Sequence, residues 1–167
     1  MFSAGQYGAA QGSKTKQSRK ETRKVKRLND YNEVKELIET KDFVFNAQRA
    51  FPTGMRSIDL TTNTGSISVK NDSVNADLPY FGRSYVSNYS GDAGINFEGR
   101  LKKENIEVND KKLRLIYSFT VTDSQDQYDV SITATSPENV SVSVISRNKA
   151  SISYSGELVR AGEEKNK

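Results

Sequence analysis

The chain of 167 residues contains no cysteine and no histidine, and both absences narrow its chemistry. Without cysteine there are no disulfides, no thiolate metal ligands and no cysteine nucleophile. Without histidine the chain lacks the commonest general base, the commonest metal ligand and the usual sensor of physiological pH. Long apolar runs are also missing, because no stretch approaches the roughly 18 residues that a membrane-spanning helix requires.

The remaining nucleophiles and carboxylates form no recognisable catalytic pattern. No serine lies in a GxSxG elbow, and a Ser-His-Asp triad is impossible without histidine. No GxGxxG or Walker sequence is present to hold phosphate. Asp123, Asp126 and Asp129 lack the alternate spacing and the central glycine of a calcium loop, and they favour a hairpin loop instead. We therefore expect no enzymatic activity, no metal site and no cofactor.

Positive charge is concentrated near the amino terminus. The stretch from Lys14 to Arg27 holds eight Lys or Arg and one acid, Glu21, so it carries +7 while the whole chain carries +4. The other residues therefore carry a net −3. Two interpretations remain open for the basic stretch: a solvated linker, or attraction to an anionic surface of the cell envelope. Because no aromatic residue is interleaved with these cations, we expect no nucleic-acid binding.

The amino-terminal residues also bear on location. Gly8, Ala9 and Ala10 are typical of the last residues of a secretory signal, although no apolar region precedes them. We hypothesise that Met1 is an internal start and that the true signal lies upstream. The protein is then expected in the periplasm, in the cell envelope or outside the cell. A cytoplasmic protein with a disordered tail is the alternative.

One stretch has the apolar spacing of a helix. Its apolar residues recur every three or four positions, and they are Val25, Leu28, Tyr31, Val34, Leu37 and Ile38. Asn29 or Asp30 can cap a shorter helix, because their short polar side chains accept hydrogen bonds from the free amides of a first turn. We expect an ordered helix from about Asp30 to Thr40, with a frayed basic extension before it.

After Lys41 the apolar period changes to two, which indicates β-strands. The clearest strand is Lys112–Thr122, and similar alternation predicts about ten short strands with no second helix between them. Their apolar residues are Phe43, Phe45, Ala47; Ile58, Leu60; Ile67, Val69; Val74, Ala76, Leu78; Ile95, Phe97, Leu101; Ile106, Val108; Leu113, Leu115, Tyr117, Phe119, Val121; Tyr128, Val130, Ile132, Ala134; Val140, Val142, Val144; and Ala150, Ile152, Tyr154, Gly156, Leu158.

Short turns separate these strands, so sequential neighbours are expected to pair as antiparallel hairpins. A meander of about eight to ten strands with one apolar face either curls into a lipocalin-like barrel or folds over as a sandwich, and we favour the barrel. The domain boundaries follow from these patterns. We expect a disordered basic arm at 1–27, one β domain with its helix at 28–160, and a disordered tail at 161–167.

The stretch Asp77–Tyr85 combines backbone constraint with large apolar side chains. Pro79 fixes its own φ and biases Leu78 toward an extended conformation, while Gly82 can adopt a positive φ. We therefore expect a strand that runs into Leu78 and then turns sharply. Its aromatic side chains are available to plug one end of a core.

The same stretch carries a family resemblance. With LPYFGRSY at 78–85, the chain resembles the uncharacterised domain family numbered 4251, found in exported proteins of Gram-negative gut bacteria. The resemblance extends to FVFNAQRAFPTG at 43–54, VKNDSVNADLPYFGRSY at 69–85, GINFEG at 94–99 and RNKASISYSGEL at 147–158. It implies an all-β body and a secreted or envelope location. Because the family has no established activity, the resemblance assigns no function.

The aromatic residues around Arg83 form the candidate binding site. Arg83 can stack on a ring or hold an anionic group, so the cluster can form the rim of a pocket at the barrel mouth. The structural alternative is that the rings cap the core and Arg83 pairs with an acid such as Asp77. The site residues are Tyr80, Phe81, Arg83, Tyr85 and Tyr89.

These patterns lead us to expect a monomeric, non-catalytic binding or scaffold module of the cell envelope. Its partner would be a small ligand or an envelope protein, with no membrane span. The alternative is a structural or protein-interaction domain without a small-molecule pocket. A polar internal cavity would favour ligand binding, whereas a solid core with an exposed apolar patch would favour a protein partner.

Overall fold

The computed structural model of the protein describes residues 11–85, 94–124 and 126–162, with side chains of the helix from Ser18 onward. Helix α1 (Gln11–Thr40) comes first, and strands joined by turns and loops follow, with no second helix among the described residues. These are β1 (Asp42–Pro52), β2 (Ile58–Asp59), β3 (Gly65–Lys70), β4 (Ser73–Leu78), β5 (Ile95–Arg100), β6 (Lys102–Asn109), β7 (Arg114–Thr122), β8 (Gln127–Ser136), β9 (Asn139–Ser146) and β10 (Ile152–Arg160).

Helix α1 is longer than we expected. It begins at Gln11, not near Asp30, so residues 11–27 of the expected arm are part of the helix. The reason is composition, since Lys, Arg, Gln and Glu favour the helix and no proline interrupts them. The other residues of the expected arm and tail, 1–10 and 163–167, lie outside the described residues.

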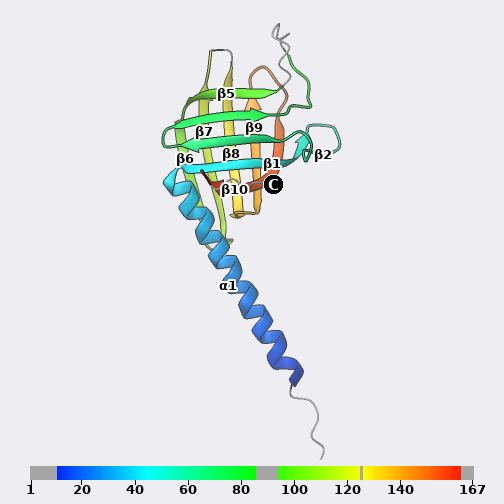
Figure 1. The fold of residues 1–167 in the computed structure, drawn as a ribbon, viewed down its shortest axis with the longest axis vertical. Helices are drawn as coiled ribbons and strands as arrows, with labels where there is room; N and C mark the ends of the chain where they lie inside the picture. Colours follow the sequence, from blue (N-terminus) through cyan, green and yellow to red (C-terminus); the bar gives the residue numbers. More distant parts are fainter. Residues whose placement is uncertain (1–10, 86–93, 125, 163–167) are drawn as a thin grey trace, which may run out of the picture.

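The apolar stripe of α1 is buried only in its carboxy-terminal half. Four of its side chains pack against the sheet, namely Tyr31, Val34, Leu37 and Ile38. Val25 and Leu28 belong to the same predicted stripe, but they are 58% and 47% exposed. The helix therefore covers the sheet with its last three turns and extends beyond it with the rest (Figure 1).

The described strands form one antiparallel sheet in the order β5-β4-β3-β1-β10-β9-β8-β7-β6, and β2 pairs with β1 beside this path. Strand β1 joins the two halves, because it pairs with β10 along its whole length and with β3 from Asp42 to Ala47. In Figure 1 the strands of the first half, β1 and β3 to β5, cross those of the second half. The sheet is thus a nearly closed barrel, which confirms the predicted fold class.

The sheet departs from a simple meander where it turns from one half to the other. Strands β5 and β6 are consecutive in the chain but lie at opposite ends of the sheet, and only Leu101 connects them. The Leu101 N–H donates to the Asp72 carbonyl over 2.8 Å, and its side chain is buried. Strand β5 packs against β7, which brings the two ends of the sheet together. Strand β6 itself is exposed throughout, including Ile106 and Val108.

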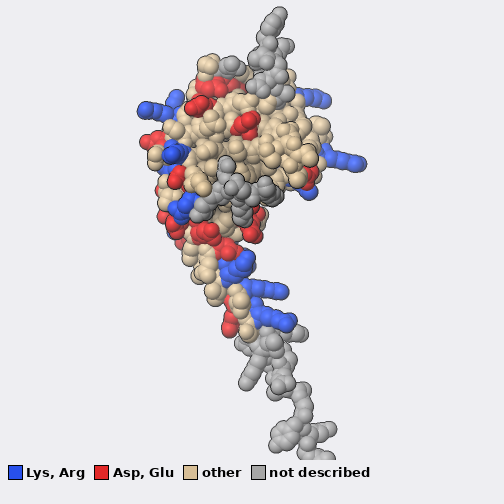
Figure 2. Space-filling view, in the orientation of Figure 1, with Lys and Arg blue, Asp and Glu red and all other residues tan. Residues whose placement is uncertain are grey.

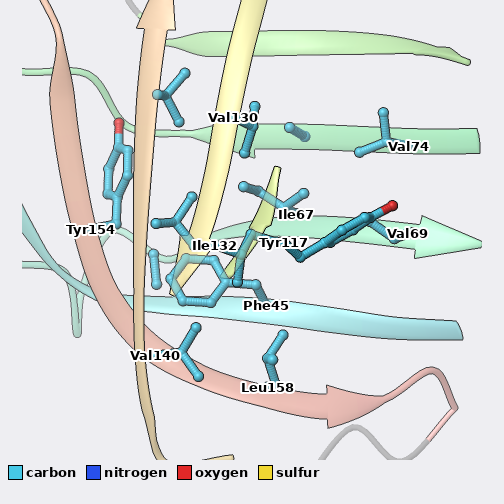
Figure 3. Packing of buried hydrophobic residues seen from close by; sticks show 14 of the residues in the cluster. Phe45, Ile67, Val69, Val74, Tyr117, Val130, Ile132, Val140, Tyr154 and Leu158 are labelled. Atoms are coloured by element: carbon cyan, nitrogen blue, oxygen red, sulfur yellow. The ribbon is translucent and has the colours of Figure 1, made fainter. Parts of the chain in front are cut away.

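The interior of the barrel is filled by large side chains from both halves of the sheet (Figure 3). Tyr117 meets Phe43 edge to face, with ring centroids 6.4 Å apart, and it also contacts Phe119. Phe45, Ile67 and Tyr154 are completely buried beside them. Burial of each such side chain contributes about 1.5 to 3 kcal/mol, so the packed interior is the main source of stability.

Three small residues lie side by side at the centre of the sheet. Ala47 of β1 pairs with Gly156 of β10 on one side and with Gly65 of β3 on the other. Gln48 follows as an extra residue that β10 does not match, and such a bulge bends a strand. The backbones approach so closely that a Cβ on Gly156 would lie 1.9 Å from the Asn46 carbonyl oxygen. The bend of β1 therefore requires glycine at 156.

Replacing this glycine tests the close approach. We expect Gly156→Ala to lower the free energy of unfolding by at least about 2 kcal/mol, because the added methyl must push β1 away from β10. Ser153→Ala, on the same strand but directed away from the core, should change it by less than about 0.5 kcal/mol. Urea unfolding followed by circular dichroism measures both. Equal effects of the two substitutions would contradict the assigned contact.

Candidate functional site

The aromatic segment after β4 is bound to the connection between β9 and β10. The Tyr80 hydroxyl lies 2.8 Å from the Arg83 carbonyl oxygen and 3.0 Å from that of Ala150, and the two share its single hydrogen. The Ala150 N–H donates to the Arg83 carbonyl over 2.9 Å, and the Tyr154 hydroxyl donates to the Pro79 carbonyl over 2.9 Å. Tyr80 and Phe81 are partly buried against the core. The segment thus fixes one end of the barrel through its backbone.

The other predicted site residues contribute little to a pocket. Arg83 is exposed, and only its carbonyl takes part in the bonds just described. Tyr85 is 69% exposed, and its N–H donates to the Asn148 carbonyl over 2.7 Å. Tyr89 lies outside the described residues. The structure therefore brings Tyr80 and Phe81 together at the core, but leaves Arg83 and Tyr85 on the surface.

A buried cation covers the ring of Tyr80. Lys149 is only 7% exposed, and its Nζ lies 5.3 Å from the centroid of the Tyr80 ring. The ammonium also donates to the Gly94 carbonyl. A cation over the face of a tyrosine is a stabilising arrangement. Burial raises the pKa of the Tyr80 hydroxyl, which therefore remains a hydrogen-bond donor at neutral pH. These contacts support a structural role for Tyr80.

A larger hollow lies elsewhere, on the outer face of the sheet over β1. This groove, which we call the β1 groove, has a volume of about 1120 Å³. Four outward side chains form a row across its floor, each paired in register with the next. They are Asp77 of β4, Ser66 of β3, Asn46 of β1 and Glu157 of β10. The row lies next to the Gly65, Ala47 and Gly156 row, so the bend of β1 positions it.

One wall of the β1 groove carries an ordered carboxylate. Asp59 of β2 accepts hydrogen bonds from the hydroxyl and the N–H of Thr61, and these lower the pKa of its carboxyl. The Arg49 guanidinium lies 3.9 Å from the same carboxyl group. Phe51 is 45% exposed and presents the only aromatic ring among the described lining residues. The groove thus combines hydroxyls, carboxylates, two amides and one apolar ring.

The sequence does contain a pattern that indicates the bend beneath this groove. The inward residues of β1 change from odd positions, Phe43 to Ala47, to the even position Ala50, and this change marks the bulge at Gln48. Glycines within strands, such as Gly65 and Gly156, often mark a bend or a close approach. The outward polar residues themselves carry no signal, because each is typical of a solvated strand face.

A smaller hollow of about 240 Å³ lies between α1 and the turn that joins β8 to β9. Its walls carry charges of both signs from the helix and from the end of β10. These include Lys26, Asp30, Glu33, Glu138 and Arg160. Its apolar lining is limited to Leu37, Pro137, Leu158 and Val159, so it resembles the edge of a helix contact more than a ligand site.

A polar cluster joins the end of α1 to strands β6 and β7. Lys41 has a positive φ of 48° directly after the helix, and its Nζ lies 2.8 Å from Glu104 and 3.5 Å from Asp72. The Tyr117 hydroxyl donates to the same Glu104 carboxylate over 2.6 Å. Burial opposes ionisation of Glu104, but the hydrogen bonds from Lys41 and Tyr117 outweigh it and lower the pKa of the carboxyl. The cluster holds the helix end in place.

The aspartates near the expected hairpin loop accept hydrogen bonds that stabilise the fold. Asp126 accepts hydrogen bonds from the N–H groups of Gln127 and Arg147 and from the Ser146 hydroxyl. The Asp129 carboxylate accepts a hydrogen bond from Thr120 over 2.7 Å. In the part of the chain that the structure describes, no three Asp or Glu residues gather as they would around a metal ion. No helix among those residues is long and apolar enough to cross a membrane.

The fold and these contacts describe a single β-barrel domain with one covering helix, and comparison with known proteins gives its family. The family model named Domain of unknown function (DUF4251) matches residues 26–158. The chain belongs to this family. That match confirms the resemblance inferred from the LPYFGRSY segment. A search of curated proteins gives no significant match.

A solved structure supports the same fold. The chain is similar to the crystal structure of a DUF4251 family protein from Bacteroides eggerthii DSM 20697, with a TM-score of 0.61. The two share 15% sequence identity over 80% of this chain and 87% of the other. At this identity the comparison concerns the fold alone.

The aromatic segment can be tested with a matched pair of substitutions. We expect Tyr80→Phe to lower the free energy of unfolding by about 1 kcal/mol, because the hydroxyl that donates to two carbonyls is lost. Arg83→Ala should change it by less than about 0.5 kcal/mol, since its side chain is exposed. Chemical unfolding of both variants measures the difference. A larger loss for Arg83→Ala would mean that the guanidinium has a structural partner.

The polar cluster predicts a pH dependence. The pKa of the Glu104 carboxyl is lower in the folded protein than in the unfolded chain, so its stabilising effect is complete above the unfolded value and is lost as pH falls through the folded value. We expect Glu104→Gln to be about 1.5 kcal/mol less stable than the parent at pH 7. This difference should shrink below about pH 4. A difference that is constant from pH 7 to pH 3 would contradict the assignment.

Proposed function

We propose that the protein is a non-catalytic binding module of the cell envelope that holds a short oligosaccharide in the β1 groove. One observation carries this proposal: a row of four polar side chains crosses the floor of an outer groove, beside an exposed ring. The barrel interior is filled by the core, so a ligand is better accommodated outside the barrel than in its mouth. The proposed site therefore differs from the predicted aromatic rim.

The lining groups suit the hydroxyls of a sugar. Carboxylates accept hydrogen bonds from hydroxyls, and the Asn46 amide and the Ser66 hydroxyl can both donate and accept. The row spans three strand spacings, about 14 Å, which favours several linked rings over a single one. Phe51 offers an apolar surface for the C–H face of one ring.

The charge of the β1 groove narrows the ligand further. Three carboxylates line it, from Asp59, Asp77 and Glu157, and one cation, from Arg49. A net negative lining repels anions, so a neutral or amino-bearing oligosaccharide fits better than an acidic one. This preference for neutral or amino-bearing sugars follows from the charges of the residues that line the groove.

The spacing of the carboxylates argues against hydrolysis of such a ligand. Asp77 and Glu157 stand at opposite ends of the row, about 14 Å apart by strand spacing. A glycosidase needs its two carboxyl groups roughly 5 to 10 Å apart across the scissile bond. Asp59 is already bound to Thr61. Binding without turnover is therefore the simpler function.

The envelope location rests on the family resemblance and on the small residues before Gln11. A protein-interaction domain is the competing function, and it would need a continuous apolar face. The large exposed apolar side chains of the described residues are instead distributed over several segments, and away from α1 only Ile106 and Val108 share an element, strand β6. Away from α1 they are Phe51, Met55, Tyr85, Ile106, Val108 and Ile145. This distribution favours the polar groove over a protein-docking surface.

Binding to a panel of neutral and amino-bearing oligosaccharides tests the proposal. We expect retention of at least one neutral or amino sugar, with affinity reduced about tenfold by Asn46→Ala, which removes a hydrogen bond, or by Glu157→Gln, which removes the charge that strengthens one. Isothermal titration calorimetry measures the affinities. Asn75→Ala, an exposed β4 residue outside the groove, is the matched control and should bind like the parent.

Two results would overturn the proposal. The binding function is wrong if no sugar is retained, or if both groove variants bind as tightly as the parent. The location is tested separately by fractionating cells of the source organism. Recovery of the chain only from the cytoplasm, beginning at Met1, would contradict an envelope protein.

A further inference from the structure

The amino-terminal half of α1 is a helix without support from the body. Residues 18–29 are exposed apart from the contacts of their own helix, and they extend away from the sheet (Figure 1). Figure 2 shows Lys and Arg side chains along this part. Cations four residues apart stand in two rows, Arg19, Arg23, Arg27 and Lys20, Lys24. Like charges at this spacing weaken an isolated helix, so an oppositely charged partner would stabilise this half.

A line of mostly polar residues, with Val25 and Leu28 as its two apolar members, runs along another side of α1. Its members are spaced alternately by four and three positions, which is the spacing by which two helices pack along their length. They are Lys14, Ser18, Glu21, Val25, Leu28, Asn32, Lys35 and Glu39. The four buried side chains of α1 do not belong to this stripe, and its members from Ser18 to Glu39 are exposed except Lys35, which is half-buried. We call it the outer stripe.

The outer stripe has its apolar residues at its centre. Val25 and Leu28 are 58% and 47% exposed, and they lie near the middle of the 30-residue helix. They are the only apolar residues of 18–29, and they lie one helical turn apart, so they form a small apolar patch on this half of the helix. A second helix crossing at this point would bury both.

Helix α1 is also divided in charge. Residues 14–27 carry +7, whereas residues 28–40 carry four acids and one lysine, a net −3. Two such helices attract each other when they run in opposite directions, because the basic half of one then lies along the acidic half of the other. A parallel pair would instead set the two basic halves against each other.

We propose that two copies of the protein pair through the outer stripes of α1, antiparallel, with Val25 of each copy opposite Leu28 of the other. In this alignment position 14 lies opposite position 39, and position 18 opposite position 35. Glu21 then lies near Lys35 of the other copy. The helices overlap along almost their whole length of about 45 Å. The two barrels stand at opposite ends of the pair.

An anionic membrane surface is the competing partner for the basic half. Its cations lie largely on the side of the helix that becomes the buried side further along, since Arg27, Tyr31 and Val34 follow each other at helical spacing. A flat surface that approached from this side would meet the barrel. The outer stripe faces elsewhere and is accessible to a second copy.

Sedimentation equilibrium on the full chain tests the pairing. We expect the mass to rise from one copy toward two between about 5 and about 500 µM, with weaker association at high salt because opposite charges are screened. Val25→Ala with Leu28→Ala should weaken association at least tenfold, since the apolar centre is lost. Lys20→Ala with Arg27→Ala, off the stripe, should change it only a few-fold. A monomer at every concentration would overturn the proposal.

Disulfide trapping tests the direction of the pair, because the chain has no cysteine of its own. A mixture of the Ser18→Cys and Lys35→Cys chains should oxidise to a covalent dimer, whereas neither variant alone should do so. Efficient dimers of Ser18→Cys alone would mean a parallel pair and would overturn the alignment. Circular dichroism should show helix content rising with concentration in the parent but not in the Val25→Ala, Leu28→Ala variant.

Discussion

The close contact between β1 and β10 at Gly156 is the constraint on which the shape of the sheet depends. Strand β1 is the only described strand that belongs to both halves, so its bend decides how one half folds over the other. The bend needs an extra residue at Gln48 and small neighbours on both sides of Ala47. With larger residues there, the two halves could not approach, and the core between them would lose its packing.

The same constraint separates the core from the candidate site. Side chains alternate between the faces of a strand, so the residues next to the small row point outward. On the inner face, Phe45 and Tyr154 fill the barrel, while on the outer face Asn46 and Glu157 meet across the bend. The barrel therefore has a packed interior and an outer groove, and the location of the groove follows from the packing.

Alternation along the chain was sufficient to predict every strand and the fold class. The reason is that the direction of side chains such as Leu115, Phe119 and Val142 depends only on the two-residue period of their own strand. The candidate groove could not be predicted in this way. It depends on register between β1, β3, β4 and β10, which bring together residues more than a hundred positions apart, such as Asn46 and Glu157. The aromatic segment was a strong local signal, but its rings support the end of the barrel and its most exposed member, Tyr85, faces solvent.

Helix α1 shows how one element can carry two patterns at once. Tyr31 and Val34 repeat with the period that packs a helix on a sheet, while Val25 and Leu28 belong to a stripe on another side. Treated as a single amphipathic stripe, the apolar residues predict an ordered helix that begins near Asp30, where burial begins. The basic half is helical in the structure although its residues 18–29 are exposed, so its order comes from helix propensity and is opposed by the repulsion between its cations. A second copy that brings its acidic half to this one supplies the missing opposite charge and leaves the β1 groove, on another element, unobstructed.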